Sequence, residues 1–202
     1  MLNKKTLIYL ATIAFVVVFA AQSFGPGDYE QRYNTGPLDI PVSKEDQKLM
    51  HEEYPNVPEQ NRYIRQSYDQ IMERFEKGTG IVFLGFKECP WCQRATPILN
   101  EVAEEEKVSI YYLDIRKLNN DDPSSYQALV RFLSPYLEKD EGGSYRIRTP
   151  DISFVKEGEI MWRYKMDTIP DEERSPTKYW TEDRIEQAKT NFRDQMKKLK
   201  ED

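Results

Sequence analysis

The sequence is poor in the residues that most often hold metal ions or staple small proteins. Its 202 residues include two cysteines, Cys89 and Cys92, and one histidine, His51. A zinc site usually needs four ligands, and His51 lies far from the cysteines in the sequence, so we expect no bound metal. A disulfide across so short a loop constrains the unfolded chain little, which makes it a poor structural staple. The pair is therefore better interpreted as a reactive dithiol centre than as a structural disulfide.

Positive charge is also in short supply. The formal net charge is −6, and it becomes −8 without residues 1–20, which leaves 27 basic residues against 35 acidic ones. A moderately acidic body argues against nucleic acid as a partner and against electrostatic docking on anionic lipid. The sequence has no internal repeat and no low-complexity block.

The N-terminus carries the one long apolar run of the chain. Lys4 and Lys5 precede the uncharged run 6–24, and this order of a positive region and an apolar region directs export. The run fits a signal peptide cleaved after Ala20, and it is also long enough to remain as a membrane anchor, since about 17–25 residues span a bilayer. In both cases the two lysines stay inside, so we expect the rest of the chain to be extracytoplasmic, where disulfides persist.

Apolar periodicity predicts helices alternating with strands in the rest of the chain. Residues 25–58 are expected to be a linker and an extension with weak helical character over 43–54, and 167–179 an acidic loop. The expected elements of a domain at 59–202 are a helix over 59–77, a strand over 81–86, a helix from the cysteine pair to 106, a strand over 108–115, a turn at 119–122, a helix over 124–139, two strands over 151–156 and 159–164, and a helix over 181–200. This order predicts an α/β fold with a mixed central sheet flanked by helices.

Three sequence features resemble the thioredoxin-like superfamily over roughly residues 60–200. The motif Cys89-Pro90-Trp91-Cys92 ends a strand and starts a helix, Pro97 follows five residues after the motif, and Thr149-Pro150 precedes a later strand. The resemblance implies a thioredoxin-like fold, here with an N-terminal extension and an inserted helix. Within the superfamily, an exported chain with Leu-Gly-Phe before this motif is similar to bacteriocin-transport accessory proteins of Gram-positive bacteria, from which we infer no function.

The motif assigns a role to each of its residues. Cys89 is the expected attacking thiolate, because the unpaired N–H groups and dipole of a helix N-terminus favour negative charge. Cys92, one turn further in, is expected to resolve the mixed disulfide. Pro90 presets the backbone at the start of the helix. Trp91 is expected to offer an apolar face to a substrate, although simple helix packing is the alternative.

The resemblance adds expectations for three other positions. It implies that Pro150 is cis and that the Thr149 backbone faces an extended substrate peptide, whereas an ordinary proline at a strand entry is the alternative. Reducing thioredoxins carry a buried carboxylate on the strand before the motif, and the corresponding residue here is Phe83. Asp114, at the end of the next strand, is another possible source of a carboxylate.

Two hypotheses of function follow. The first is an extracytoplasmic thiol–disulfide oxidoreductase, with no cofactor beyond the redox-active cysteine pair, that exchanges disulfides with exported proteins or peptides and has a membrane redox partner. The sequence leaves the direction of electron flow open. The second is a non-enzymatic, membrane-tethered accessory or chaperone-like protein that binds an exported peptide, in which the cysteines are incidental.

Overall fold

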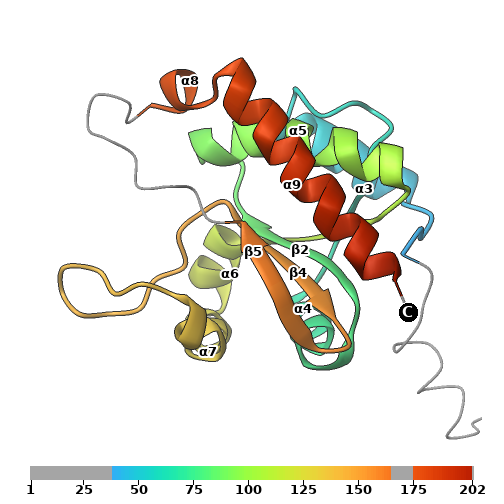
Figure 1. Ribbon diagram of the computed structural model, residues 1–202. Coiled ribbons are helices and arrows are strands. Elements are labelled where there is room, and N and C mark those ends of the chain that lie inside the picture. Colours follow the sequence, from blue (N-terminus) through green and yellow to red (C-terminus); the bar gives the residue numbers. More distant parts are fainter. Residues whose placement is uncertain (1–37, 165–174, 202) are drawn as a thin grey trace, which may run out of the picture. The chain divides into compact units, whose positions relative to one another are not determined.

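The computed structural model describes residues 38–164 and 175–201 (Figure 1). These residues belong to one compact unit, Pro37–Asp202. The leader predicted over 1–24, its cleavage after Ala20 and most of the linker lie outside the described residues, as does most of the acidic loop. In the ranges that are described, no helix combines the length and the apolar character needed to cross a membrane.

A five-stranded mixed sheet forms the centre of the unit, which confirms the predicted α/β class. The strands are β1 (Tyr63–Arg65), β2 (Gly80–Gly85), β3 (Ile110–Asp114), β4 (Asp151–Lys156) and β5 (Glu159–Tyr164), in the spatial order β1-β3-β2-β4-β5. β1 and β2 both run parallel to β3, whereas β4 is antiparallel to β2 and to β5. β2 therefore lies in the middle of the sheet, and its end points toward the cysteine pair.

Each face of the sheet packs against its own set of helices (Figure 1). Because side chains alternate along a strand, Ile81 and Phe83 of β2 enter one core and Val82 and Leu84 enter the other. The first core includes residues of α3 (Lys44–Glu53), α5 (Pro90–Glu106) and α9 (Glu182–Lys200), and the second those of α4 (Tyr68–Lys77), α6 (Ile115–Asp121) and α7 (Pro123–Leu133). Both cysteines belong to the first core.

Ion pairs align α5 with α9, which lie side by side in Figure 1. They join Lys189 to Glu101 at 2.7 Å, Arg193 to Glu105 at 2.6 Å and Lys200 to Glu106 at 2.8 Å. The two helices therefore run in the same direction. The C-terminal turn of α9 lies at the C-terminal end of α5, at the far end of that helix from the cysteine pair.

The helix predicted over 59–77 is wrong in its first half. α4 begins at Tyr68, and residues 63–65 form β1 instead, bonded to β3. The start of α4 is fixed by a capping box: the Ser67 hydroxyl accepts from the Gln70 N–H, and the Gln70 side chain accepts from the Ser67 N–H. Residues 63–65 form a strand because they make backbone hydrogen bonds to β3, which is distant in the sequence. Apolar periodicity does not reveal such bonds.

The helix predicted over 124–139 is too long. α7 ends at Leu133 and a short 3-10 turn, η1 (Ser134–Tyr136), follows. Pro135 lacks the N–H that would continue the helical ladder, and its ring clashes with the preceding turn. The predicted turn at 119–122 is also partly helical, because the Asp114 carboxylate caps α6 by accepting from the Lys117 N–H at 2.8 Å. A further short helix, α8 (Pro176–Tyr179), occupies the end of the expected acidic loop.

The segment expected to be an extension contributes to the core. Met50 of α3, Tyr54 at its C-cap and Val57 are all fully buried, in the same core as the cysteine pair. The Tyr54 and Tyr112 hydroxyls lie 3.0 Å apart, which links this segment to β3. The core of the unit therefore begins before residue 59.

Candidate redox site

The cysteine pair lies at the junction of β2 and α5. β2 ends at Gly85, Cys89 is the N-cap of α5, and Pro90 is the first helical residue. A proline is well suited to this position, because the N–H that it lacks would have no helical partner there. The Cys89 sulfur accepts a hydrogen bond from the Cys92 N–H at 3.3 Å, as a capping side chain does. Both residues are free thiols in this structure.

The two cysteines differ slightly in their exposure. Cys89 keeps 4% of its surface exposed and Cys92 keeps none. Of the two cysteines, only Cys89 therefore reaches the surface of the described residues. The helix places Cys92 directly behind Cys89, where it can attack only a bond that Cys89 has already formed.

The Thr149–Pro150 bond is cis, as expected from the sequence, and Thr149 lies against Cys89. The Thr149 hydroxyl donates to the Cys89 sulfur across 3.4 Å, and the Thr149 carbonyl oxygen lies 3.8 Å from the same sulfur. Sequence analysis assigned only the Thr149 backbone to the site. The hydroxyl contact is new, and its one signal in the sequence is that the residue before the proline carries a hydroxyl group.

Hydrogen bonds lower the pKa of Cys89 to about 6. The Cys92 thiol makes the largest contribution, followed by the Thr149 hydroxyl and the N–H groups of Cys92 and Trp91, while burial opposes the shift. Each of these donors interacts more strongly with the thiolate than with the thiol. Cys89 is therefore ionised at neutral pH.

The pKa of Cys92 is shifted the other way. Burial raises it most, and the neighbouring Cys89, to which the Cys92 thiol donates a hydrogen bond, raises it further. Cys92 therefore stays protonated while Cys89 is a thiolate. The reduced pair thus combines one nucleophile with one thiol held in reserve.

The space beneath Cys92 is aromatic and uncharged. The Phe83 ring packs at Gly85, whose neighbourhood also includes the Cys92 sulfur, and the buried Tyr63 hydroxyl donates to the Thr96 carbonyl at 2.9 Å, one turn below Cys92. Burial is also the main cause that raises the pKa of Tyr63, which remains a neutral phenol. Asp114, considered above as a source of a carboxylate, is occupied in capping α6.

The rim around Cys89 includes the other predicted site residues. Pro90 is exposed, Trp91 and Thr149 are half-buried, and Pro150 is buried. The Trp91 ring packs edge-on against Tyr179 of α8, with ring centroids 5.6 Å apart. One side of Trp91 is therefore used in packing, and the rest contributes an apolar surface beside the thiolate.

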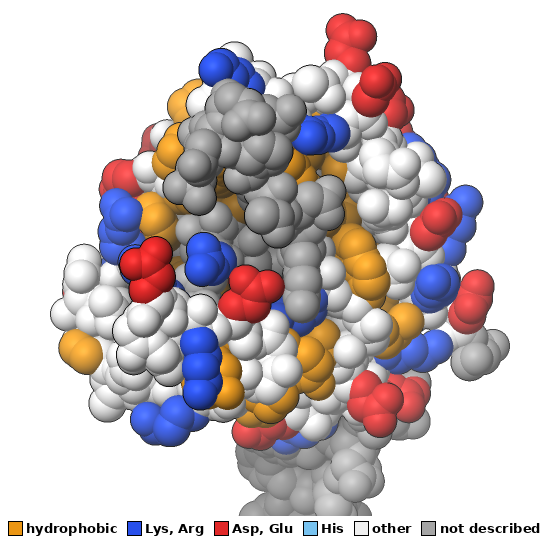
Figure 2. Space-filling model, turned by 60° about the vertical axis from the view of Figure 1, so that its left-hand side comes forward, with side chains coloured by type: hydrophobic (Ala, Val, Ile, Leu, Met, Phe, Trp, Pro, Cys, Tyr) orange, Lys and Arg blue, Asp and Glu red, His pale blue; other side chains and the backbone are white. Residues whose placement is uncertain are grey.

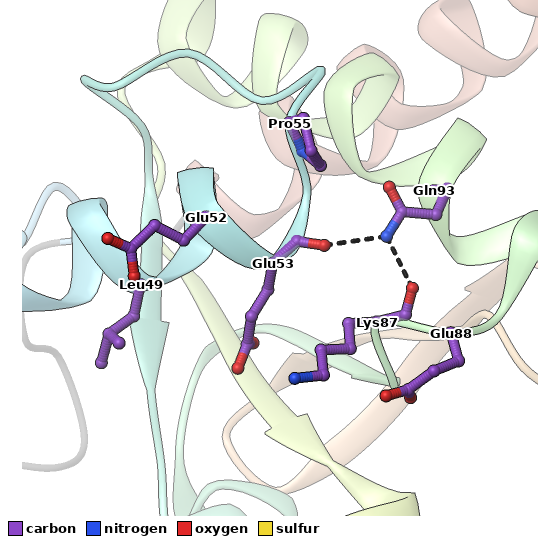
Figure 3. A pocket seen from close by; sticks show the side chains of 7 residues that line it. All are labelled: Leu49, Glu52, Glu53, Pro55, Lys87, Glu88 and Gln93. Atoms are coloured by element: carbon purple, nitrogen blue, oxygen red, sulfur yellow. Dashed lines mark hydrogen bonds between the residues drawn. The ribbon is translucent and has the colours of Figure 1, made fainter.

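A pocket adjoins the loop that leads into Cys89 (Figure 3). Its volume is about 580 Å³, and it is lined by residues of α3 and the turn after it, of this loop and of α5: Leu49, Glu52, Glu53, Pro55, Lys87, Glu88 and Gln93. The Gln93 side-chain amide donates to the Glu53 carbonyl at 2.8 Å and to the Lys87 carbonyl at 2.6 Å. Gln93 thereby ties α3 to the loop before the nucleophile. Sequence analysis did not identify this residue.

Possible metal ligands and similarity to known families both bear on the identity of the site. Among the described residues, no group of three or more His, Cys, Asp or Glu side chains is arranged to hold a metal ion. A comparison of the sequence with models of known protein families finds no match.

Proposed function

We propose that this protein is a thiol–disulfide oxidoreductase of the thioredoxin-like fold that acts outside the cytoplasm. The observation that carries the proposal is the asymmetry of the cysteine pair. Cys89 has a pKa of about 6 and a trace of solvent exposure, whereas Cys92 is buried, protonated and one helical turn behind it. The strand order and the Thr149–Pro150 segment against Cys89 support the fold assignment.

The chemistry proceeds in two exchanges. The Cys89 thiolate attacks one sulfur of a substrate disulfide, forms a mixed disulfide and releases the other substrate sulfur as a thiolate. Cys92 then loses its proton and attacks the Cys89 sulfur, which closes the Cys89–Cys92 disulfide and releases the second substrate thiolate. The substrate is reduced by two electrons and the cysteine pair is oxidised by two. The reverse sequence, with a substrate thiolate attacking the Cys89–Cys92 disulfide, donates a disulfide.

The surroundings of Cys92 bear on its deprotonation. In the reducing direction, the Cys92 proton must leave as the second exchange occurs. The groups beneath Cys92 are an aromatic ring and neutral phenols, and Phe83 stands where reducing thioredoxins carry a carboxylate. The released substrate thiolate is therefore the natural proton acceptor, since it forms next to Cys89.

The predicted leader supports the cellular part of the proposal. Export would place the pair where disulfides persist, facing exported proteins or peptides, and the N-terminal segment would anchor the chain in the membrane or be removed. A membrane redox partner would recycle the pair. A non-enzymatic accessory role would need neither the depressed pKa of Cys89 nor the buried second thiol.

The test uses the full-length chain, reduced and then freed of reductant, with a disulfide-linked peptide as substrate. Wild type is expected to reduce the peptide with loss of both thiols. Cys92→Ser is expected to stop at the mixed disulfide, because the resolving thiol is gone, and mass spectrometry will detect the adduct on Cys89. Cys89→Ser is expected to form no adduct.

Two results would contradict the proposal. If Cys89→Ser exchanges with the peptide as fast as wild type, or if Cys92→Ser yields no mixed disulfide, the pair is not a redox centre. A titration of the wild-type pair against glutathione gives the direction: a potential of about −120 mV indicates a disulfide donor, and one of about −270 mV a reductant.

A further inference from the structure

Three exposed cations lie close in sequence to residues of the candidate redox site. Lys87 lies two residues before Cys89, Arg94 two residues after Cys92, and Arg148 immediately before Thr149. Arg94 follows Pro90 by one helical turn, so it extends from the same exposed side of α5 as the rim. We call Lys87, Arg94 and Arg148 the cationic rim. All three are exposed, and none makes an ion pair with a residue that the structure describes.

Among the described residues, the acidic side chains around the pocket each pair with a cation outside the rim. Glu88 pairs with Arg116 at 3.5 Å, and Glu53 pairs with Arg65 at 2.5 Å. Glu52, on the α3 side of the pocket in Figure 3, lies 3.8 Å from Lys48. In the part of the chain that the structure describes, the cations of the rim are therefore not paired with these acids, although the whole chain carries a net charge of −6.

The positive charge of the rim is a local feature. The face drawn in Figure 2 shows Lys and Arg side chains interspersed with Asp and Glu, so it does not carry a single sign of charge. The rim is distinguished by its place in the chain, since all three of its residues stand within two positions of Cys89, Cys92 or Thr149.

The cationic rim is not needed to form the thiolate. The Cys92 thiol, the Thr149 hydroxyl and backbone N–H groups account for the low pKa of Cys89. None of these three cations belongs to a buried ion pair among the residues that the structure describes. Their charges are left for whatever approaches the sulfur.

We propose that the cationic rim selects polypeptide substrates with acidic residues flanking the reacting cysteine. This inference rests on the proposed function and names its substrate class. An approaching peptide must lie across the rim to bring its sulfur to Cys89, because Cys89 keeps only 4% of its surface exposed. Carboxylates on both sides of that sulfur then meet Lys87, Arg94 and Arg148, which speeds encounter and fixes orientation.

A polypeptide fits the rim better than a membrane surface does. The cations stand within two residues of Cys89, Cys92 or Thr149, and a polypeptide offers both the disulfide and the flanking charges. An acidic body is repelled by anionic lipid. The small size of the rim also favours a polypeptide over a membrane surface, since three cations match a short peptide segment.

The experiment compares two peptides of equal length, each with one disulfide, that differ only in glutamates or lysines beside the cysteines. The rate constant of exchange with the reduced full-length protein is measured at low and at high salt. We expect the glutamate peptide to react about tenfold faster at low salt, with the difference shrinking as salt screens the charges. The triple variant Lys87→Glu, Arg94→Glu, Arg148→Glu should reverse the preference.

The matched control is the triple variant Lys44→Glu, Lys197→Glu, Lys198→Glu. It changes the net charge equally, at exposed sites on α3 and on the end of α9 farthest from Cys89. The preference should survive in this control. Equal rates for both peptides with wild type, or an equal effect of both triple variants, overturns the inference and leaves the proposed function standing.

Two further outcomes decide whether the proposed function fails and whether the rim faces a membrane. If wild type exchanges with neither peptide, the proposed function fails and the inference falls with it. If wild type binds phosphatidylglycerol vesicles and the rim variant loses that binding while peptide rates stay equal, the rim faces a membrane and the peptide inference is overturned.

Discussion

At the scale of single residues, the nucleophile is prepared by hydrogen bonds. The Thr149 hydroxyl reaches the Cys89 sulfur from a segment 60 residues away in the sequence. In contrast to the Cys92 N–H, this donor belongs to a side chain and can be removed without touching the backbone. Its contribution to the thiolate is therefore open to direct measurement.

Thr149→Val should raise the pKa of Cys89 by about one pH unit, because valine has the shape of threonine without the hydroxyl donor. Thiolate absorbance near 240 nm, followed against pH on the reduced protein, measures the change. Thr149→Ser, which keeps the hydroxyl, should leave the pKa close to that of wild type. A valine variant with an unchanged pKa would show that the hydroxyl does not act on the thiolate.

Gly85 is needed for close packing behind the cysteine pair. A Cβ atom at this position would lie 2.5 Å from a carbon of the Phe83 ring and 3.1 Å from the Cys92 sulfur. Both neighbours are fully buried. Gly85→Ala should therefore lower the free energy of unfolding by about 1–3 kcal/mol.

Urea unfolding of the reduced protein measures this cost. Gly142→Ala serves as the control, since its Cβ would meet only an Asp140 carboxylate oxygen, at 3.3 Å, in an exposed loop. Surface changes of this kind usually stay within about 0.5 kcal/mol. Equal stabilities for the two variants would contradict the packing argument.

Sequence reasoning located the cysteine pair because its spacing is local information, and it located Thr149-Pro150 through the resemblance to the thioredoxin-like superfamily. It missed the Thr149 hydroxyl contact and the Gln93 amide, which joins the Glu53 and Lys87 carbonyls. Those contacts depend on segments brought together only by the folded sheet. A polar side chain in a sequence does not reveal which of several distant carbonyls it will meet.

At the scale of elements, helix boundaries follow capping chemistry. Ser67 and Gln70 form a reciprocal capping box at the start of α4. Ser67→Ala should lower the free energy of unfolding by about 1 kcal/mol, because the Gln70 N–H loses its acceptor. Chemical denaturation is the measurement. Ser144→Ala, in an exposed loop, is the control and should be close to neutral; a similar loss in both would refute the capping role.

The same box explains what the sequence could and could not predict about this region. The pattern Ser-x-x-Gln was present in the sequence and marks the true start of α4, whereas apolar spacing extended the helix back to residue 59. β1 has only three residues and owes its structure to its partner β3. Elements of that length are set by tertiary pairing, so no local pattern predicts them. The longer strands and α9 were predicted because their apolar pattern repeats several times.

At the scale of the whole molecule, the N-terminal extension and the domain that carries the sheet share one core. Met50 of α3 is fully buried beside Tyr54 and Val57. Met50→Ala should therefore lower the free energy of unfolding of the entire unit by about 2–5 kcal/mol, in a single transition. Lys48→Ala, two residues away on α3 and exposed, is the matched control. Separate transitions for α3 and for the sheet would show that the extension folds independently.

The stability of the reduced protein should depend on pH through the cysteine pair. The pKa of Cys89 is about 6 in the folded protein and about 8.5 in an unfolded chain. A group whose pKa is lowered by folding stabilises the folded state above its unfolded pKa, and that contribution disappears as the pH falls toward 6. Cys92, whose pKa is raised, acts in the opposite sense and only above about pH 8.5, where the unfolded chain begins to ionise.

The difference in free energy of unfolding between reduced wild type and Cys89→Ser isolates the first effect, because Cys92 is present in both proteins. We expect this difference to be smallest near pH 5 and to grow in favour of wild type up to about pH 8.5. Urea titrations at half-unit intervals of pH, under reducing conditions, measure it. A difference that stays constant from pH 5 to 8.5 would mean that folding does not stabilise the Cys89 thiolate, and the asymmetry on which the proposed chemistry depends would be lost.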